Sequence, residues 1–270
     1  MDKVEKKSKQ ELIQINGNGL FTKGEVNISI SKAKDSDNAG IVFLLKDQRI
    51  PACVDFVSNT VRNTVLSNES ESICLIEHFL AACSLFGISD IEVKCSANEL
   101  VFNDGSAVHY FQAFKDSPYV KNIKEKYDLK EVIFLNDKKK QIVALPHNGF
   151  KISYFMDYDH PALGKLFGSW EKGEDPHKLL RARTFAPKDE NNFFGLGEKL
   201  LSLDESSFNK KLHEPLEPVY HKILDIIGDL RLAEINPLEI NMHVIGFKSG
   251  HALNVELARA LFSTSLKQTV

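Results

Sequence analysis

The sequence lacks the features that would place it in a membrane, in a secretory route or on nucleic acid. Among its 270 residues, no apolar run approaches the roughly 20 residues needed to span a bilayer. The basic first ten residues, MDKVEKKSKQ, have no apolar segment behind them, so they do not resemble a secretory signal. A net charge of -3 provides no global basic field, which argues against nucleic acid as a partner. We therefore expect a cytoplasmic protein without a membrane span.

Cysteine is scarce as well. Cys53, Cys74, Cys83 and Cys95 all lie in the first half, and their spacing fits neither a CxxC zinc site nor a disulfide framework. We expect reduced and mostly buried thiols. Hydrophobic residues at 43% and charged residues at 26% are ordinary for a folded protein, and the length allows one large domain or two of ordinary size.

The most informative segment that is present is Tyr220–Leu230, YHKILDIIGDL. Its apolar residues recur at helical spacing and predict an amphipathic helix with one buried side. His221, Asp225 and Asp229 stand at i, i+4 and i+8, so an imidazole and two carboxylates share one narrow stripe. A His and an Asp one turn apart can bind one divalent ion such as zinc. Because the same pair is common on solvated helices, this segment alone leaves both interpretations open.

A second apolar segment, Ile73–Phe86, predicts a mostly buried helix that contains Glu77 and His78. Two ionisable side chains in so apolar a run are costly unless each has a partner. They are either a metal ligand with an adjacent carboxylate base, or a satisfied pair where the helix reaches the surface. The local pattern does not decide between these two.

The remaining pattern predicts an α+β fold. The polar segment Ser117–Asp128 is the best candidate for a linker. Helices are expected at Ala107–Phe114 and Ala252–Phe262. Strands are expected at Leu12–Ile15, Val26–Ser31, Ile41–Leu45, Asn63–Leu66, Ile91–Cys95, Glu131–Leu135, Gln141–Leu145, Phe150–Met156 and Glu239–Phe247.

The two halves of the chain share a plan. In each, a helix with a histidine leads to a strand and then to a glycine turn that starts another helix. His78 precedes Gly105 by 27 positions, and His221 precedes Gly250 by 29. This self-similarity predicts a duplicated unit, with a first domain over residues 1–120 and a second over residues 129–270. If the two sheet-and-helix-pair domains pack face to face, His78 and the His221 stripe would meet between them, where ligand sites are common.

Six short motifs follow one another along the chain. They are Ile76-Glu77-His78 with Ala81-Ala82, Asp104-Gly105-Ser106, Asp159-His160-Pro161, Ala182-Arg183-Thr184-Phe185, His221-Lys222-Ile223-Leu224-Asp225 with Gly228-Asp229-Leu230, and Lys248-Ser249-Gly250-His251. Over the span from about Leu12 to Phe262, they resemble a known family, the zinc-dependent UDP-3-O-acyl-N-acetylglucosamine deacetylases of lipid A biosynthesis. Any one motif would be weak evidence, whereas six in the family's order are specific.

The resemblance implies a metal centre with an adjacent base. Zinc, or iron on the same ligands, would be held by His78, His221 and Asp225. Glu77 would be the general base that takes a proton from the attacking water. His251 would be the cation that stabilises charge and protonates the leaving amine.

The resemblance also implies supporting roles. Asp229 would orient His251, and Thr184 would donate a hydrogen bond to the developing oxyanion. Lys222 and Phe185 would contact the sugar-nucleotide and acyl parts of the substrate. Three of the residues also have a purely structural interpretation: His251 as a solvent-exposed neighbour of a helix cap, Thr184 as an ordinary strand residue, and Lys222 as a solvated cation.

The implied function is removal of the N-acetyl group from an acylated UDP-N-acetylglucosamine, with release of acetate, by a monomer that touches a membrane surface at most transiently. Two departures from the family keep alternatives open. Phe21 follows Gly17-Asn18-Gly19-Leu20 where the family has histidine. Residues 186–218 look like a shortened, more polar version of the family's β-α-β insert, and we predict no second strand there. The alternatives are a deacetylase of a different acylated amino sugar, or a protein that binds a UDP-sugar lipid without catalysis.

Overall fold

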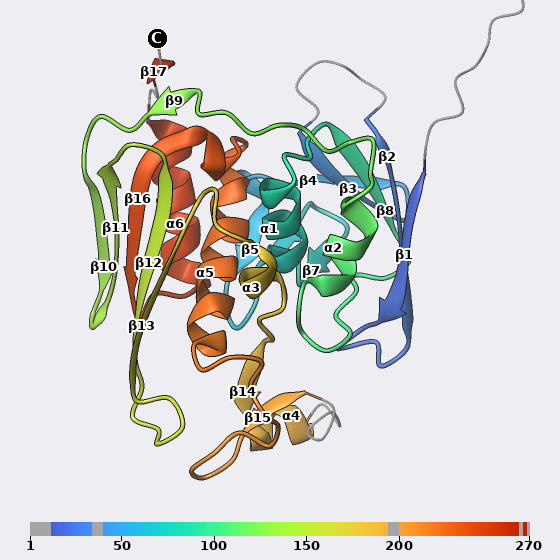
Figure 1. The fold of residues 1–270 in the computed structure, drawn as a ribbon. Coiled ribbons are helices and arrows are strands. Elements are labelled where there is room, and N and C mark those ends of the chain that lie inside the picture. The colour runs from blue at the N-terminus through green and yellow to red at the C-terminus, as the bar shows by residue number, and fades with distance from the viewer. Residues whose placement is uncertain (1–11, 34–39, 194–199, 265–266, 269–270) are drawn as a thin grey trace, which may run out of the picture.

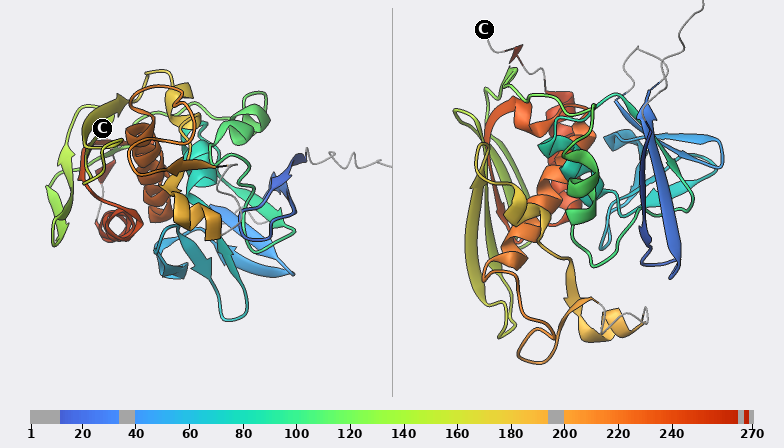
Figure 2. Two further views of the ribbon diagram at one scale, coloured as in Figure 1. Left: turned by 90° about the horizontal axis from the view of Figure 1, so that it is seen from below. Right: turned by 45° about the vertical axis from the view of Figure 1, so that its right-hand side comes forward.

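Two β-sheets enclose a layer of helices in the computed structural model, which describes residues 12–33, 40–193, 200–264 and 267–268 (Figures 1 and 2). The helices are α1 (Glu77–Leu85), α2 (Val108–Phe114), α5 (Glu217–Leu230) and α6 (His251–Ser263). The first sheet has the order β1 (Ile13–Asn18), β2 (Glu25–Lys32), β8 (Ile91–Cys95), β3 (Ile41–Leu45) and β4 (Gln48–Pro51). The second has the order β10 (Ile133–Asp137), β11 (Lys140–Pro146), β16 (Ile240–Phe247), β12 (Phe150–Asp157) and β13 (Lys165–Glu171).

The two sheets have the same topology. In each, the middle strand, β8 or β16, pairs antiparallel with the second strand of a hairpin and parallel with the first strand of another. The predicted α+β class is therefore confirmed, and the two halves match each other as repeats of one unit would. The domain limits at residues 120 and 129 remain a prediction.

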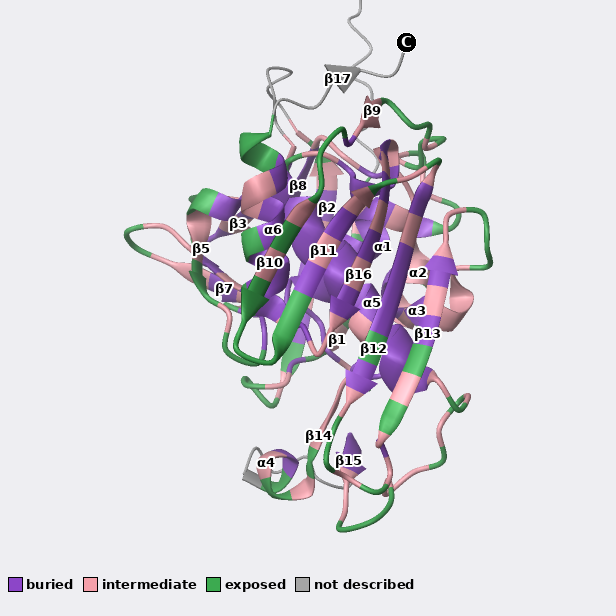
Figure 3. Ribbon diagram, turned by 90° about the vertical axis from the view of Figure 1, so that its left-hand side faces the viewer, coloured by how far each residue is buried: buried purple, intermediate pink, exposed green. Residues whose placement is uncertain are grey.

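Alternating side chains join each sheet to the helices. Along β16, Ile240, Met242 and Val244 are buried, while the residues between them are partly exposed on the outer face of the sheet (Figure 3). The first sheet shows the same alternation along β2. Side chains of a strand point to opposite faces in turn, so each sheet buries one face against the helix layer and leaves the other towards solvent.

Helix α5 lies at the centre of this layer. Every one of its residues except Lys222 is buried, and Pro218 stands in its first turn, where a missing N–H costs nothing. Its Gly228 lies against α1: a Cβ added there would stand 2.0 Å from the main-chain oxygen of Glu77. Only glycine permits so close a crossing, which places the metal-ligand segments of α1 and α5 side by side.

The predicted helix over Ile73–Phe86 is wrong at its N-terminal end. Ile73 lies in β7 (Ser72–Cys74), which forms a small sheet with β5 (Val57–Asn59) and β6 (Val65–Ser67). Leu75 then adopts a positive φ of 57°, and α1 begins only at Glu77. A short buried strand and a buried helix both produce a continuous apolar run, so periodicity alone does not separate them.

The prediction that residues 186–218 contain no second strand is also wrong. β14 (Phe185–Pro187) is followed by α4 (Lys188–Phe193), and β15 (Leu201–Leu203) pairs in parallel with β14, which makes a small β-α-β insert at the bottom of Figure 1. Three residues are too few to show an alternating pattern in the sequence.

No helix of the described residues is long and apolar enough to cross a bilayer. The four cysteines are free, and Cys53, Cys83 and Cys95 are buried, as expected. The connecting elements are α3 (His177–Leu180) and the 3-10 turns at Val54–Phe56, Arg231–Ala233 and Pro237–Glu239. The two-residue strands β9 (Tyr127–Asp128) and β17 (Lys267–Gln268) belong to the second sheet, where β9 pairs with β16 and β17 with β9.

Candidate metal centre

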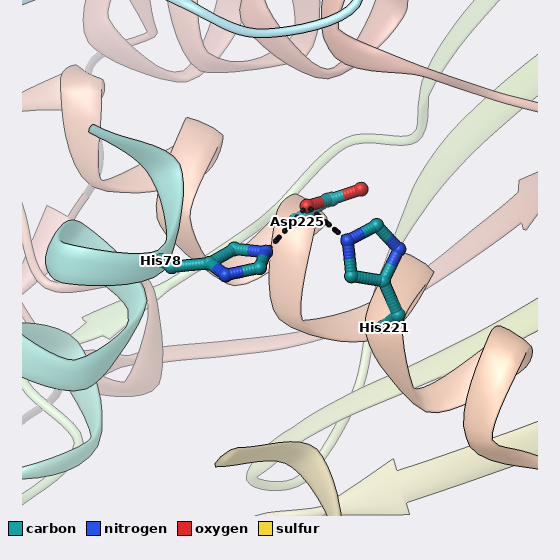
Figure 4. A group of neighbouring side chains, drawn as sticks. All are labelled: His78, His221 and Asp225. Carbon is teal, nitrogen blue, oxygen red and sulfur yellow. Dashed lines mark ion pairs between the residues drawn. The ribbon is translucent and has the colours of Figure 1, made fainter. Parts of the chain in front are cut away.

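Helices α1 and α5 bring the three predicted metal ligands together (Figure 4). Nε2 of His78 lies 3.3 Å from Oδ1 of Asp225, and Nε2 of His221 lies 3.6 Å from the same oxygen. The three ligand atoms lie within 4.8 Å of one another, and all three residues are buried. The i, i+4 pair on α5 thus gains its third member from a helix in the other half of the chain.

This donor set fits a divalent transition metal. Zinc bonds of about 2.0–2.1 Å in a tetrahedral arrangement place neighbouring ligand atoms about 3.3 Å apart, close to both distances from Asp225. Two imidazoles and one carboxylate are the protein ligands of several catalytic zinc sites, and iron accepts the same donors.

The protonation states of the ligands also suit a metal. Burial lowers the pKa of His221 well below its ordinary value, so the imidazole is neutral and its nitrogen can coordinate. Burial alone would raise the pKa of Asp225, but His221 and Lys222 hold it well below the usual range. Lys222 Nζ donates to Oδ2 of Asp225 at 2.9 Å, which leaves Oδ1 facing the two imidazoles.

Glu77 directly precedes His78 and lines one cavity with His221 and Asp225. Its side chain is buried, and burial raises its pKa although the neighbouring His251 and His78 oppose that shift. A carboxylate with a raised pKa is a better proton acceptor at neutral pH than a free glutamate. The main-chain N–H of Thr64 donates to its Oε2 at 3.3 Å.

His251 stands at the start of α6 and is bound to Asp229. Its Nδ1 donates to Oδ2 of Asp229 at 2.9 Å, and Asp229 is fully buried. Burial alone would lower the pKa of His251, but the Asp229 carboxylate outweighs it and raises the pKa to about 9. The imidazole is therefore protonated at neutral pH and can act as an acid.

Thr184 is held by the Asp104-Gly105-Ser106 turn. Its main-chain N–H and its hydroxyl both donate to the carbonyl oxygen of Gly105, at 2.8 and 3.1 Å. The hydroxyl oxygen also lies 3.1 Å from Nε2 of His221, beside the metal ligands. Donation to a substrate oxygen would require this hydroxyl to turn away from Gly105. The preceding Arg183 anchors the motif to α5 through an ion pair with Glu217 at 2.7 Å.

A cavity of about 260 Å³ opens onto these residues. Its polar lining includes Glu77, Thr184, His221, Lys222, Asp225 and His251, whereas His78 is not part of the lining. Its apolar wall includes Leu20, Phe21, Leu75, Phe102, Phe185 and Leu200, so the β14–β15 insert forms part of the wall. A larger cavity of about 480 Å³ lies at the other end of α5, and none of the predicted residues line it.

The Phe185 ring packs against His221 and Lys222 of α5. Its ring centroid lies 5.7 Å from that of His221, and Lys222 Nζ lies 5.9 Å from the centroid of the Phe185 ring. Lys222 is also engaged by Asp225, so both predicted substrate-contacting residues line the cavity while packing against metal ligands.

Three residues support the site in ways that the sequence did not indicate: Gly228 belongs to one of the six motifs but was given no role, and Asn254 and Thr64 were not singled out. Gly228 permits the helix crossing, Asn254 Nδ2 donates to Asp229 at 2.9 Å, and the Thr64 hydroxyl donates to Asp229 at 2.6 Å. Asn254 follows His251 by one helical turn, a spacing that could have signalled it. No pattern in the sequence marks Thr64.

Comparison with known proteins identifies the family of the chain. The family model described as UDP-3-O-acyl N-acetylglycosamine deacetylase matches residues 6–263. The chain belongs to this family. A UDP-3-O-acyl-N-acetylglucosamine deacetylase of Thermodesulfovibrio yellowstonii is 32% identical, over 93% of this chain and 90% of that relative. The deacetylase of Haemophilus influenzae is 30% identical, over 96% and 90%, and that of Nostoc sp. is 28% identical, over 80% and 82%. As a member of the deacetylase family, the chain is a hydrolase of lipid A biosynthesis.

Proposed function

We propose that this protein hydrolyses the acetamide of a UDP-3-O-acyl-N-acetylglucosamine and releases acetate. One observation carries the proposal: His78, His221 and Asp225 form a buried cluster, and the last two line a cavity together with the Glu77 carboxylate and the carboxylate-bound imidazole of His251. The family and the names of the relatives supply the substrate class.

The three ligands would hold zinc, which supplies Lewis acidity and lowers the pKa of a water toward about 7. Glu77 then takes a proton from the attacking water, for which its raised pKa and buried position at the cavity suit it. As Glu77 takes this proton, a lone pair of the water oxygen forms the new bond to the acetamide carbon and the π electrons of the carbonyl move onto its oxygen.

His251 completes the reaction as the acid. Protonated at neutral pH, it donates its proton to the amide nitrogen as the carbon–nitrogen bond breaks. The hydroxyl from water stays on the acyl carbon, so the products are acetate and the free amine of the sugar. Asp229 keeps His251 oriented, and the Thr184 hydroxyl stabilises the carbonyl oxygen as it gains negative charge.

The cavity walls suit the two ends of such a substrate. The charge of Lys222 can meet the anionic diphosphate, which a protein of net negative charge has to bind through local cations. The apolar wall formed by Leu20, Phe21, Phe185 and Leu200 can take an acyl chain. Zinc as the metal in cells, a monomeric state and a cytoplasmic location are parts of this proposal, as is at most transient membrane-surface contact.

Acetate release tests the proposal directly. Purified protein with a full complement of zinc should release acetate from UDP-3-O-acyl-N-acetylglucosamine, lose the activity on chelation and regain it on addition of zinc. No turnover by the zinc-loaded protein, together with tight binding of the same molecule, would favour a binding protein without catalysis.

Phe21 motivates a second candidate, a deacetylase of a different acylated amino sugar. It lines the cavity with an exposed apolar ring where the family resemblance leads us to expect histidine. A panel of substrates that varies the nucleotide and the acyl chain separates the two candidates, because only the second predicts a preference outside the UDP-linked series.

A further inference from the structure

Thr64 is a buried polar residue in a surface turn. It lies between β5 and β6, two residues after Arg62 and three after Val61, which is 68% exposed. None of its own surface is accessible, and it does not line the cavity. A hydroxyl removed from water in this way needs a partner inside the protein.

Both polar groups of Thr64 reach the acid and the base of the proposed reaction. Its hydroxyl donates to Oδ1 of Asp229 at 2.6 Å, between residues 165 positions apart in the chain. Its main-chain N–H donates to Oε2 of Glu77 at 3.3 Å. Hydrogen bonds to a buried carboxylate are shorter and stronger than those between neutral groups, so Thr64 links the two halves of the chain at the site itself.

The Thr64 hydroxyl binds a different oxygen of Asp229 from the one that His251 and Asn254 bind. Oδ2 of that carboxylate accepts hydrogen bonds from His251 Nδ1 and Asn254 Nδ2, both at 2.9 Å, whereas Oδ1 accepts the bond from Thr64. The terminal torsion of an aspartate has a broad energy profile. Donors on Oδ2 alone would let the carboxylate turn about its own bond, and a donor on each oxygen prevents it.

We propose that Thr64 is a positioning residue that holds Glu77 and the His251–Asp229 pair at one fixed separation and orientation. This inference rests on the proposed function, because only in hydrolysis do the two groups act on the same acetamide. A base and an acid must both come within about 3 Å of their target atoms, and a misplacement of about 1 Å can cost about 100-fold in rate. Thr64 does not line the cavity, and its hydroxyl and main-chain N–H are bound to Asp229 and Glu77, so its effect passes through those two residues.

Removal of the hydroxyl without a change of shape tests this role. Thr64→Val should lower kcat about 10–100-fold with KM within about twofold, and should keep the wild-type zinc content. Thr64→Ser, which restores the donor, should recover kcat to within about threefold of wild type. Ser58→Ala is the control, since Ser58 lies in the neighbouring β5 and its hydroxyl donates to the carbonyl oxygen of Val65 rather than to a residue of the site. It should leave kcat unchanged.

A second measurement does not depend on turnover. The charged groups facing His251 are Asp229 and Asp225 on α5 and Glu77 on α1. An NMR titration of the His251 ring in the zinc-loaded protein compares its pKa in wild type, where the Asp229 carboxylate raises it, with its pKa in the variants. Thr64→Val should lower it, because a carboxylate free to turn holds the proton less well, and Thr64→Ser should restore it. If the Val variant does not fold, Thr64→Ala takes its place.

The outcomes separate this inference from the proposed function. An inactive wild type defeats the proposed function, whereas an active wild type with an equally active Thr64→Val defeats only the role of Thr64. A Val variant that loses thermal stability but keeps kcat and the His251 pKa shows a structural residue and overturns the inference. A loss of kcat that Thr64→Ser does not recover also overturns it.

Discussion

Substitution of Gly228 by alanine tests whether the close crossing of α1 and α5 assembles the metal centre. In most helices this change is favourable, because alanine is better than glycine in a helix interior by about 1 kcal/mol. Here the added Cβ would stand 2.0 Å from the main-chain oxygen of Glu77 and 2.7 Å from its carbonyl carbon. Main-chain atoms of a buried helix cannot swing aside, so one helix has to retreat from the other.

The two effects have opposite signs, and their sizes decide the outcome. Overpacking of a well-packed core costs about 1–3 kcal/mol, and a contact this short belongs at the upper end of that range. Alanine regains about 1 kcal/mol through its higher helix propensity, so the net loss of unfolding free energy is about 2 kcal/mol. For a chain of this size, that corresponds to a fall of roughly 5 °C in Tm.

The same displacement should weaken metal binding. His78 lies on α1 and Asp225 on α5, with 3.3 Å between their ligand atoms, so a retreat of about 1 Å spoils a tetrahedral geometry. We expect zinc affinity to fall about 10–100-fold, measured by competition with a chelating dye, and acetate release to fall with it.

Gly24→Ala is the control. A Cβ there meets its nearest atom, the main-chain oxygen of Thr22, at an ordinary 3.7 Å, and Gly24 lies outside the cavity lining. Its stability should stay within about 0.5 kcal/mol of wild type, with unchanged zinc affinity. A Gly228→Ala variant that is as stable as wild type and binds zinc equally well would show that this contact does not hold the site together.

Two further predictions concern the site and its support. Glu77→Ala should lose acetate release while retaining zinc, whereas His78→Ala should lose both, and metal analysis showing equal zinc loss in the two variants would contradict the assigned roles. Burial alone would raise the pKa of Glu217, but the Arg183 guanidinium and two main-chain N–H groups hold it below the ordinary value of 4.5. The ionised Glu217 carboxylate therefore stabilises the folded protein fully above pH 4.5, and this contribution is lost as the pH falls through the lowered pKa. Urea unfolding between pH 3 and 7 should therefore be flatter with pH for Glu217→Gln than for wild type, and identical slopes would rule out this coupling.

Much of the architecture could be predicted from the sequence. The strands over Ile41–Leu45 and Ile91–Cys95 and the polar stripe of α5 follow from repeats of two or 3.6 residues, which reflect only how neighbouring side chains share a face. The short motifs indicated the family because each preserves local spacing. The insert was missed because β15 has three residues, and the start of α1 was misplaced because Ile73 is as apolar in a buried strand as in a buried helix.

The sequence by itself determined which side chains can take part: an imidazole and a carboxylate one turn apart on α5, and a Glu–His pair in an apolar helix. Only the tertiary structure decided which of them meet. His78 joins Asp225 because Gly228 lets two helices touch, and Thr64 reaches Asp229 from a turn 165 positions away. The physical reason is that contacts between distant segments follow from packing of whole faces, and a hydrogen bond made once across such an interface leaves no periodic trace in the chain.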